Sequence, residues 1–487
     1  MTHPITAWPV NVDKLRARLT DAGFTGRCVA RCDEPRVYKD AIARWAENFE
    51  GLPALVVFPE TEEQVAVVIR FAVAEGFTIG LRCGGHNGAP MQEETILMDM
   101  RCFHNVRVDA ATRRVTFGGG CTWGEVYDVA NAEGLTVVGG GYHGVGVGGY
   151  LSGGGYSWWS GKYGMGCDNV VSARMCLADG SIVTVNDEQN TDLFYGIRGG
   201  HGQFGVILEF TVQAYEGSRR ALTGMLGYRP DQLTSLLEVL HQDFFPVRTS
   251  NESVVLGFMR LPPNHDPVVA IMPWIQGDDT YIANIKNIFT SKVKPVVDFT
   301  HIAKDQVEIA HGADKMFAAP GARRKIDAPT TTADIWPDMV TQVWDKWQEF
   351  TEAVPDCRGS VVLFECHDQA GIASRACNAT AWTARDPHYY VVCTGTSMTP
   401  VTDELSQMFA IETAELIGAH HLKHTGKPAR QWGIGRLNKG TNEFTYTYAT
   451  DRDRIKEIKE RRDPHGVFQS PMGQQTHSKL RQRMGLA

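Results

Sequence analysis

The stretch GLRCGGHNGAP, residues 80–90, places one histidine among glycines directly after an apolar segment. A histidine in a turn is usually a surface residue or a hydrogen-bonding partner of the backbone. Held beside closely packed backbone, His86 could instead serve as a ligand, a base or a point of covalent attachment. The neighbouring sequence helps to separate these roles.

The segment before this loop has the pattern of a strand, a helix and a second strand. ALVVF, residues 54–58, is an apolar run typical of a buried strand. Thr61 and Gln64 form a capping-box pattern that opens a helix, and Gly76 marks its end. FTIGLR, residues 77–82, predicts the second strand. The glycine loop therefore follows a β-α-β unit.

A second glycine-rich segment, residues 139–155, has ten glycines in seventeen positions. Gly144, Gly146 and Gly149 fit the letter pattern of a dinucleotide-binding fingerprint, with Asp168 nineteen residues further on. We reject that interpretation because the fingerprint follows a strand and opens a helix, whereas three more glycines follow here and oppose a helix. A P-loop is excluded too, because the chain has no Gly-Lys-Ser/Thr.

So many glycines have another physical use. Without a Cβ atom, the backbone can approach a flat or anionic ligand closely and direct N–H groups at it. The loops at 84–88 and 139–155 therefore suggest a large bound cofactor that carries phosphates. The alternative is a pair of glycine-rich turns that only pack tightly against protein.

The rest of the chain falls into two regions that differ in the predicted order and length of their helices and strands. Residues 114–135 add a strand and a short helix, and residues 169–186 predict a hairpin that turns at Asp179-Gly180. After about residue 216, longer helical patterns alternate with strands such as ESVVLGFM and HYYVVCTG, which indicates a second α+β domain. FAAPGARRKIDAP, residues 317–329, predicts a surface loop, and DRDRIKEIKERR, residues 451–462, a charged helix.

Several of these segments together resemble FAD-linked oxidases of the vanillyl-alcohol oxidase type, in the berberine-bridge-enzyme-like subgroup. RCGGHNGA, residues 82–89, is similar to the R-[SG]-G-G-H motif of that subgroup, and the segment from Gly144 onward to its second FAD loop. Its later motifs are similar to four segments here, DLFYGIRGGHGQFGVILEFT (192–211), ATAWTARDPHYYVV (379–392), YTYATD (446–451) and RRDPHGVF (461–468).

The resemblance implies an α+β, two-domain FAD-binding fold of the PCMH type, with an inserted α+β substrate domain built from an antiparallel sheet and helices. Residues 1–215 would form the FAD-binding domain and 216–430 the substrate-binding domain. Residues 431–487 would form a C-terminal segment that returns to the FAD domain. The change of texture near residue 216 agrees with this division.

The resemblance also implies FAD, joined through its 8α-methyl group to a ring nitrogen of His86. Many relatives have a second, cysteinyl link, but Tyr142 stands at that cysteine position, and Cys83 and Cys167 are displaced from it, so we expect one histidyl link. The other expected FAD contacts are Arg82, Cys83, Gly84, Gly85, Asn87, Gly88, Tyr142, Gly144, Val145, Gly148, Gly149, Ser152, Gly153, Gly154, Gly155, Val206, Ile207 and Tyr448.

Some positions depart from the family motifs. His201 and Gln203 replace a glycine and an asparagine of the third motif, and Thr447 replaces the asparagine of Y-x-N-Y. These changes would reshape the flavin site without abolishing binding. Val145 aligns where the family has a small residue that governs oxygen access, which favours O₂ as the electron acceptor.

Oxidation by a flavin needs a base for the departing O–H or N–H proton. Tyr448 is the first candidate by resemblance, and the alternative is a half-buried strand tyrosine. Glu365, on the predicted strand VVLFEC, is the second candidate, and the alternative is a carboxylate at the rim. His143 would line the substrate cavity or only pack beside Tyr142.

Two further groups of residues are assigned structural roles. Trp158 and Trp159 could cover the cofactor, but core packing is the preferred interpretation. His420, His421 and His424, in HHLKH, could suggest a metal, but we interpret them as a solvated helix end and expect no metal.

The resemblance implies a covalent FAD-dependent oxidase that takes a hydride from an alcohol, amine or activated C–H of a small specialised metabolite and gives H₂O₂. The alternatives are a dehydrogenase with another acceptor, a non-redox cyclase or isomerase, and a flavin carrier without turnover. Neither the substrate nor the oligomeric state can be read from the residues.

Composition and charge exclude other classes. The net charge of −8 disfavours nucleic-acid binding, which needs a basic face. The sequence has no run near the ~18 apolar residues that span a bilayer, so we expect no membrane partner. It shows no secretory signal pattern, so we expect a cytoplasmic protein whose eleven cysteines are mostly reduced.

Overall fold

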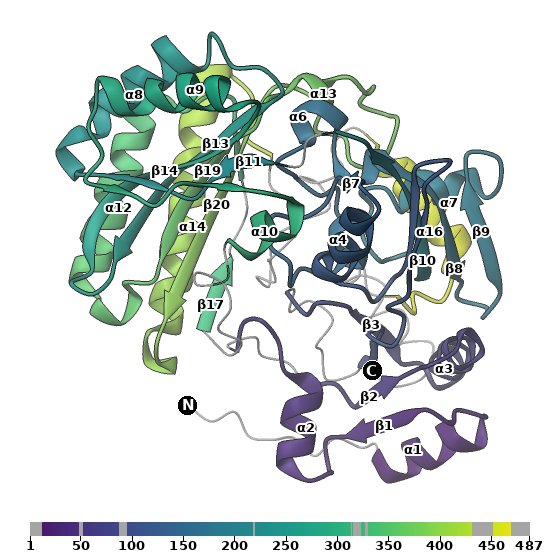
Figure 1. The fold of residues 1–487 in the computed structure, drawn as a ribbon. Coiled ribbons are helices and arrows are strands. Elements are labelled where there is room, and N and C mark those ends of the chain that lie inside the picture. The colour runs from purple at the N-terminus through teal and green to yellow at the C-terminus, as the bar shows by residue number, and fades with distance from the viewer. Residues whose placement is uncertain are drawn as a thin grey trace.

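The computed structural model describes residues 12–47, 52–86, 95–217, 220–312, 314, 323–326, 330–430 and 451–468. Within these ranges the strands form three sheets with helices packed on them (Figure 1). The same ranges hold no helix that combines the length and apolarity needed to cross a bilayer.

The first sheet is the β-α-β unit that the sequence predicts, with a strand added between its two strands. Its order is β1 (Arg27–Ala30), β2 (Leu55–Phe58), β4 (Thr95–Asp99) and β3 (Thr78–Arg82), and β4 is parallel to both β2 and β3. Helix α3 (Glu62–Glu75) connects β2 to β3. The Thr61 side chain caps it by accepting from the Gln64 N–H, and left-handed Gly76 ends it. Helices α1 (Val12–Asp21) and α2 (Pro35–Ile42) precede β1 and β2, respectively.

The second sheet is antiparallel and carries the other elements of the N-terminal half. Its order is β5 (Val106–Asp109), β6 (Arg114–Gly118), β10 (Val206–Tyr215), β8 (Val170–Cys176) and β9 (Ile182–Asn186), and β7 (Thr136–Val137) pairs with β10. The predicted β8–β9 hairpin is confirmed, with Gly180 at φ 80° in its turn. Helices α4 (Trp123–Ala132), α6 (Ser160–Tyr163) and α7 (Thr191–Gly196) belong to this half.

The chain returns to this half near its C-terminal end. Helix α16 (Arg452–Arg462) packs against α7, side by side with it in Figure 1. Beyond α16, the Ile79 N–H of β3 donates to the Val467 carbonyl at 2.7 Å. Because these contacts join the C-terminal segment to the first two sheets, we propose the boundaries 1–215, 216–430 and 431–487 for two domains and a returning segment.

The third sheet is antiparallel and follows residue 216. Its main path is β15 (Val297–Asp298), β12 (Leu226–Tyr228), β14 (Asp266–Gln276), β13 (Glu252–Leu261), β19 (Val361–Cys366), β20 (Tyr389–Ser397) and β17 (Arg323–Ile326). At its edges lie β11 (Ala221–Thr223), β16 (His301–Ala303) and β18 (Thr330–Thr332). The longer helices of this region are α8 (Leu233–Val239), α9 (Asp279–Ser291), α12 (Pro337–Ala353) and α14 (Asp403–Thr425), and α10 (Gln306–His311) and α13 (Ala370–Ala373) are shorter.

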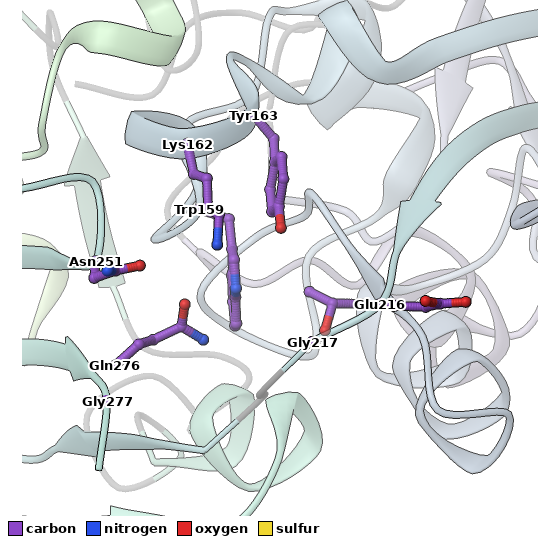
Figure 2. A pocket seen from close by; sticks show the side chains of 9 residues that line it. Trp159, Lys162, Tyr163, Glu216, Gly217, Asn251, Gln276 and Gly277 are labelled. Carbon is purple, nitrogen blue, oxygen red and sulfur yellow. The ribbon is translucent and has the colours of Figure 1, made fainter.

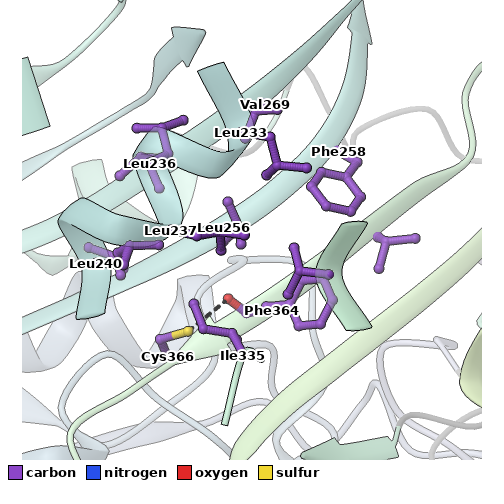
Figure 3. Close-up of a cluster of buried hydrophobic side chains, with 14 of the residues drawn as sticks. Leu233, Leu236, Leu237, Leu240, Leu256, Phe258, Val269, Ile335, Phe364 and Cys366 are labelled. Carbon is purple, nitrogen blue, oxygen red and sulfur yellow. Dashed lines mark hydrogen bonds between the residues drawn. The ribbon is translucent and has the colours of Figure 1, made fainter. Parts of the chain in front are cut away.

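Strand alternation decides what each face of this sheet contacts. Leu256 and Phe258 of β13 and Phe364 of β19 point to the helices and pack with α8 and α12 in an apolar core (Figure 3). Val255 of β13 and Leu363 of β19 belong to a separate cluster on the opposite face, against which Trp158 packs. The face of the third sheet opposite this core therefore meets Trp158, which follows the glycine-rich segment of the first half.

Two sequence predictions were wrong. A short helix, α5 (Val147–Ser152), forms inside the glycine-rich segment despite its glycines, because Leu151 and Val147 are fully buried in the second core and anchor it. The predicted surface loop at 317–329 contains β17, which pairs with β20, and Arg324 within it is buried. In both cases tertiary contacts outweigh the local preference.

Candidate functional site

The two glycine loops pack directly against each other. A Cβ atom at Gly84 would lie 2.4 Å from the Gly146 nitrogen and 2.8 Å from the Gly144 oxygen. A Cβ atom at Gly146 would lie 2.3 Å from the Gly84 nitrogen and 2.4 Å from the Cys83 sulfur. Side chains at these two positions are therefore excluded by backbone, and the contact fixes His86 beside the second loop.

His86 lies at the end of the first loop in an aromatic setting. Its ring stacks on Trp45, with centroids 5.0 Å apart and planes at 18°, and meets Tyr142 edge-on at 5.9 Å. Burial lowers the pKa of His86 to about 4, with smaller contributions from the charges of Arg324 and His143. His86 is therefore a neutral imidazole at neutral pH, which is the form with a nucleophilic ring nitrogen.

Positive charge gathers around this histidine. Arg324 lies over the Trp45 ring at 4.4 Å from its centroid. Arg44 is buried next to Gly85, and burial together with the charge of Arg82 lowers its pKa to about 9. An anionic group bound here would offset this cost of burying cations. The loops thus offer Cβ-free backbone and buried cations, which suits a cofactor that carries phosphates.

The charge is partly balanced by one buried acid. Asp99, fully buried at the end of β4, lies 3.5 Å from Arg82 and accepts two hydrogen bonds from the Arg101 Nε, at 3.0 and 3.1 Å. One carboxylate thus faces the guanidinium groups of Arg82 and Arg101, and Arg44 adds a further cation.

The side chains considered for a second flavin link are placed differently. Cys83 donates to the Cys121 carbonyl at 3.1 Å, and burial raises the pKa of its thiol to about 11. Cys167 is buried beside Trp382, and burial raises the pKa of its thiol further. Both are protonated thiols at neutral pH and therefore poor nucleophiles. Tyr142 contacts His86 edge-on from the second loop.

The remaining predicted FAD contacts fall into three groups. Val206 and Ile207 begin β10 and lie in the apolar cores, and Ser152 donates to the Gly148 carbonyl at 2.7 Å. Val145 accepts from the Trp123 N–H at 3.0 Å, and Gly149 faces open space, with no atom within 4 Å of a Cβ built there. Asn87, Gly88, Thr447 and Tyr448 lie outside the described residues.

Glycines 153–155 have protein partners. A Cβ atom at Gly154 would lie 2.4 Å from the Trp382 ring, and one at Gly155 would lie 2.3 Å from the Tyr150 ring. A Cβ atom at Gly153 would meet the Gly149 carbonyl at 3.1 Å. Gly154 therefore allows the second loop to pack on Trp382 of the third-sheet region, whereas Gly153 and Gly155 allow contacts within the loop.

Glu365 lies on the face of the third sheet that meets this loop. Alternation along β19 puts it on the same side as Leu363, and it pairs across the sheet with Tyr390. His367 lies 3.0 Å away, from its Nε2 to the Glu365 Oε2, and its Nδ1 lies 3.4 Å from the Ser253 hydroxyl. The Glu365 side chain is 25% exposed and that of His367 only 4%. A ligand can therefore contact the carboxylate, whereas the hydrogen-bonded imidazole lies on its buried side.

Aromatic side chains surround this carboxylate. Tyr156 stacks on Tyr390 with centroids 4.6 Å apart, and its hydroxyl contacts the Nε2 atom of His388. Burial lowers the pKa of His388 to about 4, so it is neutral. Trp158 meets the His367 ring edge-on at 5.7 Å, and a Cβ atom at Gly141 would lie 3.2 Å from the Trp158 Nε1. The base candidate and the glycine loop therefore border the same aromatic cluster.

His143 does not join this cluster. Its Nε2 lies 2.8 Å from an Asp314 carboxylate oxygen, and its ring stacks on His311 of α10 at 4.0 Å. The structure therefore brings together His86, Tyr142 and His143, whose ring meets that of Tyr142 edge-on at 4.7 Å as the packing alternative predicts, and separately Glu365 and His367. Trp159 is buried against Trp274, as the core-packing interpretation predicts.

Several residues of the site were not found from the sequence. His367 stands two positions after Glu365, and the period of two along a strand could have indicated that the pair shares a face. Arg44, Trp45 and Arg324 carry no such signal, because they reach His86 from distant segments. Asp168, rejected as a ribose ligand, forms a buried bidentate pair with Arg385 at 2.6 and 2.7 Å.

Two other predictions have structural outcomes. His201, which replaces a family glycine, adopts φ 60°, a conformation that favours glycine, and burial lowers its pKa to about 4. Gln203 is fully buried, and its side-chain amide donates to the Gly200 carbonyl at 2.5 Å. The HHLKH end of α14 is not simply solvated, because His420 is only 7% exposed and faces Asp338 of α12. The solvated-end prediction was therefore wrong for this histidine.

A cavity of about 160 Å³ opens elsewhere on the seam between the two halves (Figure 2). Lys162 and Tyr163 line it from α6, and Asn251, which precedes β13, and Gln276 of β14 line it from the other side. It includes none of the predicted site residues, so we do not assign it to the cofactor.

Comparison with known proteins identifies the class. Residues 53–186 match the model of an FAD binding domain family. An FAD-linked oxidoreductase, pgmH, from Aspergillus terreus is 33% identical over 208 residues, which is 42% of this chain and 42% of that protein. The (R)-6-hydroxynicotine oxidase of Paenarthrobacter nicotinovorans is 33% identical over 212 residues, 42% of this chain and 46% of that enzyme. These alignments thus span less than half of each relative.

Solved structures share the whole fold. The crystal structure of 6-hydroxy-D-nicotine oxidase from Arthrobacter nicotinovorans has a TM-score of 0.78 at 21% identity and covers 92% of this chain and 97% of its own. Berberine bridge enzyme from Eschscholzia californica has a TM-score of 0.77 at 18% identity and covers 94% and 98%. The protein is thus an FAD-binding protein with the two-domain PCMH-type fold. Its sequence relatives include FAD-linked oxidoreductases, and the solved structures that share its fold include 6-hydroxynicotine oxidase and berberine bridge enzyme.

Proposed function

We propose that the protein is an oxidase with FAD attached covalently through His86 alone, and that it oxidises a small apolar or aromatic metabolite with release of H₂O₂. The observation that carries the proposal is the neutral His86 imidazole, held by two interlocked glycine loops beside buried arginines. FAD, when bound, accepts a hydride from the substrate and passes the electrons on to O₂.

The chain's own residues supply binding and proton transfer. Arg44 and Arg324 would hold the anionic part of the cofactor, and the loop backbone at Gly84 and Gly146 would set its distance. Glu365 would take the proton of the substrate O–H or N–H as the hydride leaves, with His367 hydrogen-bonded to the second side of the carboxylate. Tyr448 remains the other candidate for the base.

The substrate class follows from the lining. Tyr156, Tyr390 and Trp158 place aromatic surface around Glu365, which favours an aromatic or otherwise apolar ligand over a sugar. The relative named for oxidation of 6-hydroxynicotine, a heteroaromatic amine, supports the same class. Val145 stands where the resemblance implies a residue that governs oxygen access to the flavin. We therefore expect O₂ to accept the electrons.

The test is a screen of aromatic amines and alcohols with the purified holoprotein. We expect a substrate to bleach the 450-nm flavin band without O₂, and air to restore the band with one H₂O₂ per turnover. Bleaching that air does not reverse would identify a dehydrogenase, the second candidate. Turnover of a substrate without any bleaching would refute a redox function.

Glu365→Gln separates the roles of the two base candidates. It should lower the rate of anaerobic bleaching by at least 100-fold while the FAD content stays at the wild-type level. Tyr448→Phe should then have the smaller effect. A bleaching rate in Glu365→Gln within threefold of wild type would remove Glu365 as the base.

A further inference from the structure

Three side chains on the far face of the third sheet have the composition of a metal site. His420 and His424 are four residues apart on α14, so they share one face of the helix. Asp338 stands in the first turn of α12 and faces both of them. Two histidines at this helical spacing with one carboxylate form a common ligand set for Zn²⁺.

The separations between the ligand atoms fit a metal better than hydrogen bonds. The His420 Nδ1 lies 3.4 Å from the Asp338 Oδ2, and the His424 Nε2 also lies 3.4 Å from that carboxylate. A hydrogen bond from an imidazole to a carboxylate is normally about 2.7–3.2 Å long. Ligand atoms bound about 2.05 Å from a tetrahedral Zn²⁺ lie about 3.3 Å apart, along the edge of the tetrahedron.

The burial of His420 is an independent sign. Its ring is 7% exposed, and its Nδ1 atom is buried with no hydrogen-bond partner. Burying an imidazole nitrogen without a partner is unfavourable unless something completes its bonding. A metal ion between this nitrogen and the carboxylate would satisfy both.

The other two ligands are prepared in different ways. His424 stacks on Trp336 with centroids 4.3 Å apart and planes at 12°, which fixes the orientation of its ring. Lys423 donates to the Asp338 Oδ2 at 3.0 Å, so its ammonium group now pairs with the carboxylate that a metal ion would bind. Because the Lys423 side chain is 64% exposed, it can swing into solvent when a metal ion binds.

A second group of the same composition has shorter distances between its atoms. In the cluster of His143, His311 and Asp314, both histidines lie 2.8 Å from the carboxylate, at ordinary hydrogen-bond length. The distances in that cluster are those of hydrogen bonds, so it supplies a matched control.

We propose that Asp338, His420 and His424 bind one divalent transition-metal ion, Zn²⁺ in preference to Mg²⁺ or Ca²⁺, with water as the fourth ligand. The ion joins the start of α12 to the end of α14. These helices cover the face of the sheet opposite Glu365, so the site is structural and separate from the proposed flavin chemistry. The inference is independent of the proposed function.

The experiment measures Zn²⁺ bound by the holoprotein after chelator treatment and removal of the chelator, by equilibrium dialysis with elemental analysis. Wild type should bind one more equivalent than His424→Ala at 10 μM free Zn²⁺, and Asp338→Asn should lose the same equivalent. His311→Ala should bind as wild type does. Zn²⁺ should raise the unfolding temperature of wild type and of His311→Ala but not of His424→Ala.

Lys423→Met gives a test that a folding defect cannot imitate. Removal of the competing ammonium should tighten the Zn²⁺ affinity of this site severalfold, whereas a fortuitous surface site would not respond. Equal Zn²⁺ stoichiometry in wild type, His424→Ala and Asp338→Asn would overturn the proposal. A loss of Zn²⁺ in His311→Ala that is absent from His424→Ala would overturn it as well, and would assign the metal to the other cluster.

Discussion

Substitution of Gly84 by alanine tests how the cofactor loops are held together. The new methyl carbon would lie 2.4 Å from the Gly146 nitrogen, whereas ordinary contacts of a Cβ atom begin at 3.4 Å. The loops must therefore separate by about 1 Å, and neither partner atom can move as a side chain would, since both belong to the backbone. Overpacking of this kind costs about 1–3 kcal/mol, and we expect the upper end of that range.

The matched control is Gly149→Ala on the same loop. A Cβ atom there meets no protein atom within 4 Å, and Gly149 lies in α5. Alanine in a helix is more favourable than glycine by about 0.5–1 kcal/mol, so the apoprotein should be as stable as wild type or slightly more so. Any loss of FAD in this variant would then report that the cofactor fills the open space.

Urea unfolding followed by tryptophan fluorescence gives the stabilities, and the absorbance at 450 nm gives the FAD content. We expect Gly84→Ala to lower the unfolding midpoint and to lose most of its FAD. A Gly84→Ala protein with wild-type stability and full FAD content would refute the argument from loop contact. So would a Gly149→Ala apoprotein that is less stable than Gly84→Ala.

Three other predictions follow from the described contacts. Asp168→Asn leaves the buried Arg385 guanidinium without its carboxylate and should cost about 3–5 kcal/mol of unfolding free energy in the same urea assay. The double variant with Arg385→Met should recover part of this loss. Equal losses in the single and double variants would contradict the prediction. His367→Asn removes the support of Glu365 and should lower kcat about 10–100-fold in steady-state assays with KM unchanged within twofold; an effect on KM alone would assign it to substrate binding. Burial holds the pKa of His388 near 4, while this side chain titrates near 6.5 in the unfolded chain, so the unfolded state takes up a proton first as the pH falls and stability drops between pH 6.5 and 4. The slope of the urea midpoint against pH should therefore be shallower in His388→Asn. An unchanged slope would count against this assignment.

The sequence was sufficient for the parts of the site that local pattern controls. The β2–α3–β3 unit follows from an apolar run, a threonine cap and a terminal glycine, and it delivers the first glycine loop to the end of β3. The alternation along β19 places Glu365 on an open face. The resemblance then adds FAD and His86, which periodicity alone does not indicate.

Contacts between distant segments could not be predicted from the sequence. The Trp45 ring reaches His86 from the N-terminal region and Arg324 covers it from a strand that composition predicts to be a loop. Helix α5 forms because Leu151 is buried in the second core, although its glycines disfavour a helix. His420 is buried at the start of the HHLKH segment, because α12 packs against α14.

The proposed bond between His86 and the flavin can be tested directly. The decisive measurement is acid precipitation of the purified holoprotein and of His86→Ala, followed by the yellow colour and flavin fluorescence of each pellet. We predict that both signals stay with the denatured wild-type chain and are lost from the variant. Colour retained in both proteins would require a second attachment residue and contradict the role given to Tyr142, and colour released from wild type would contradict covalent attachment altogether.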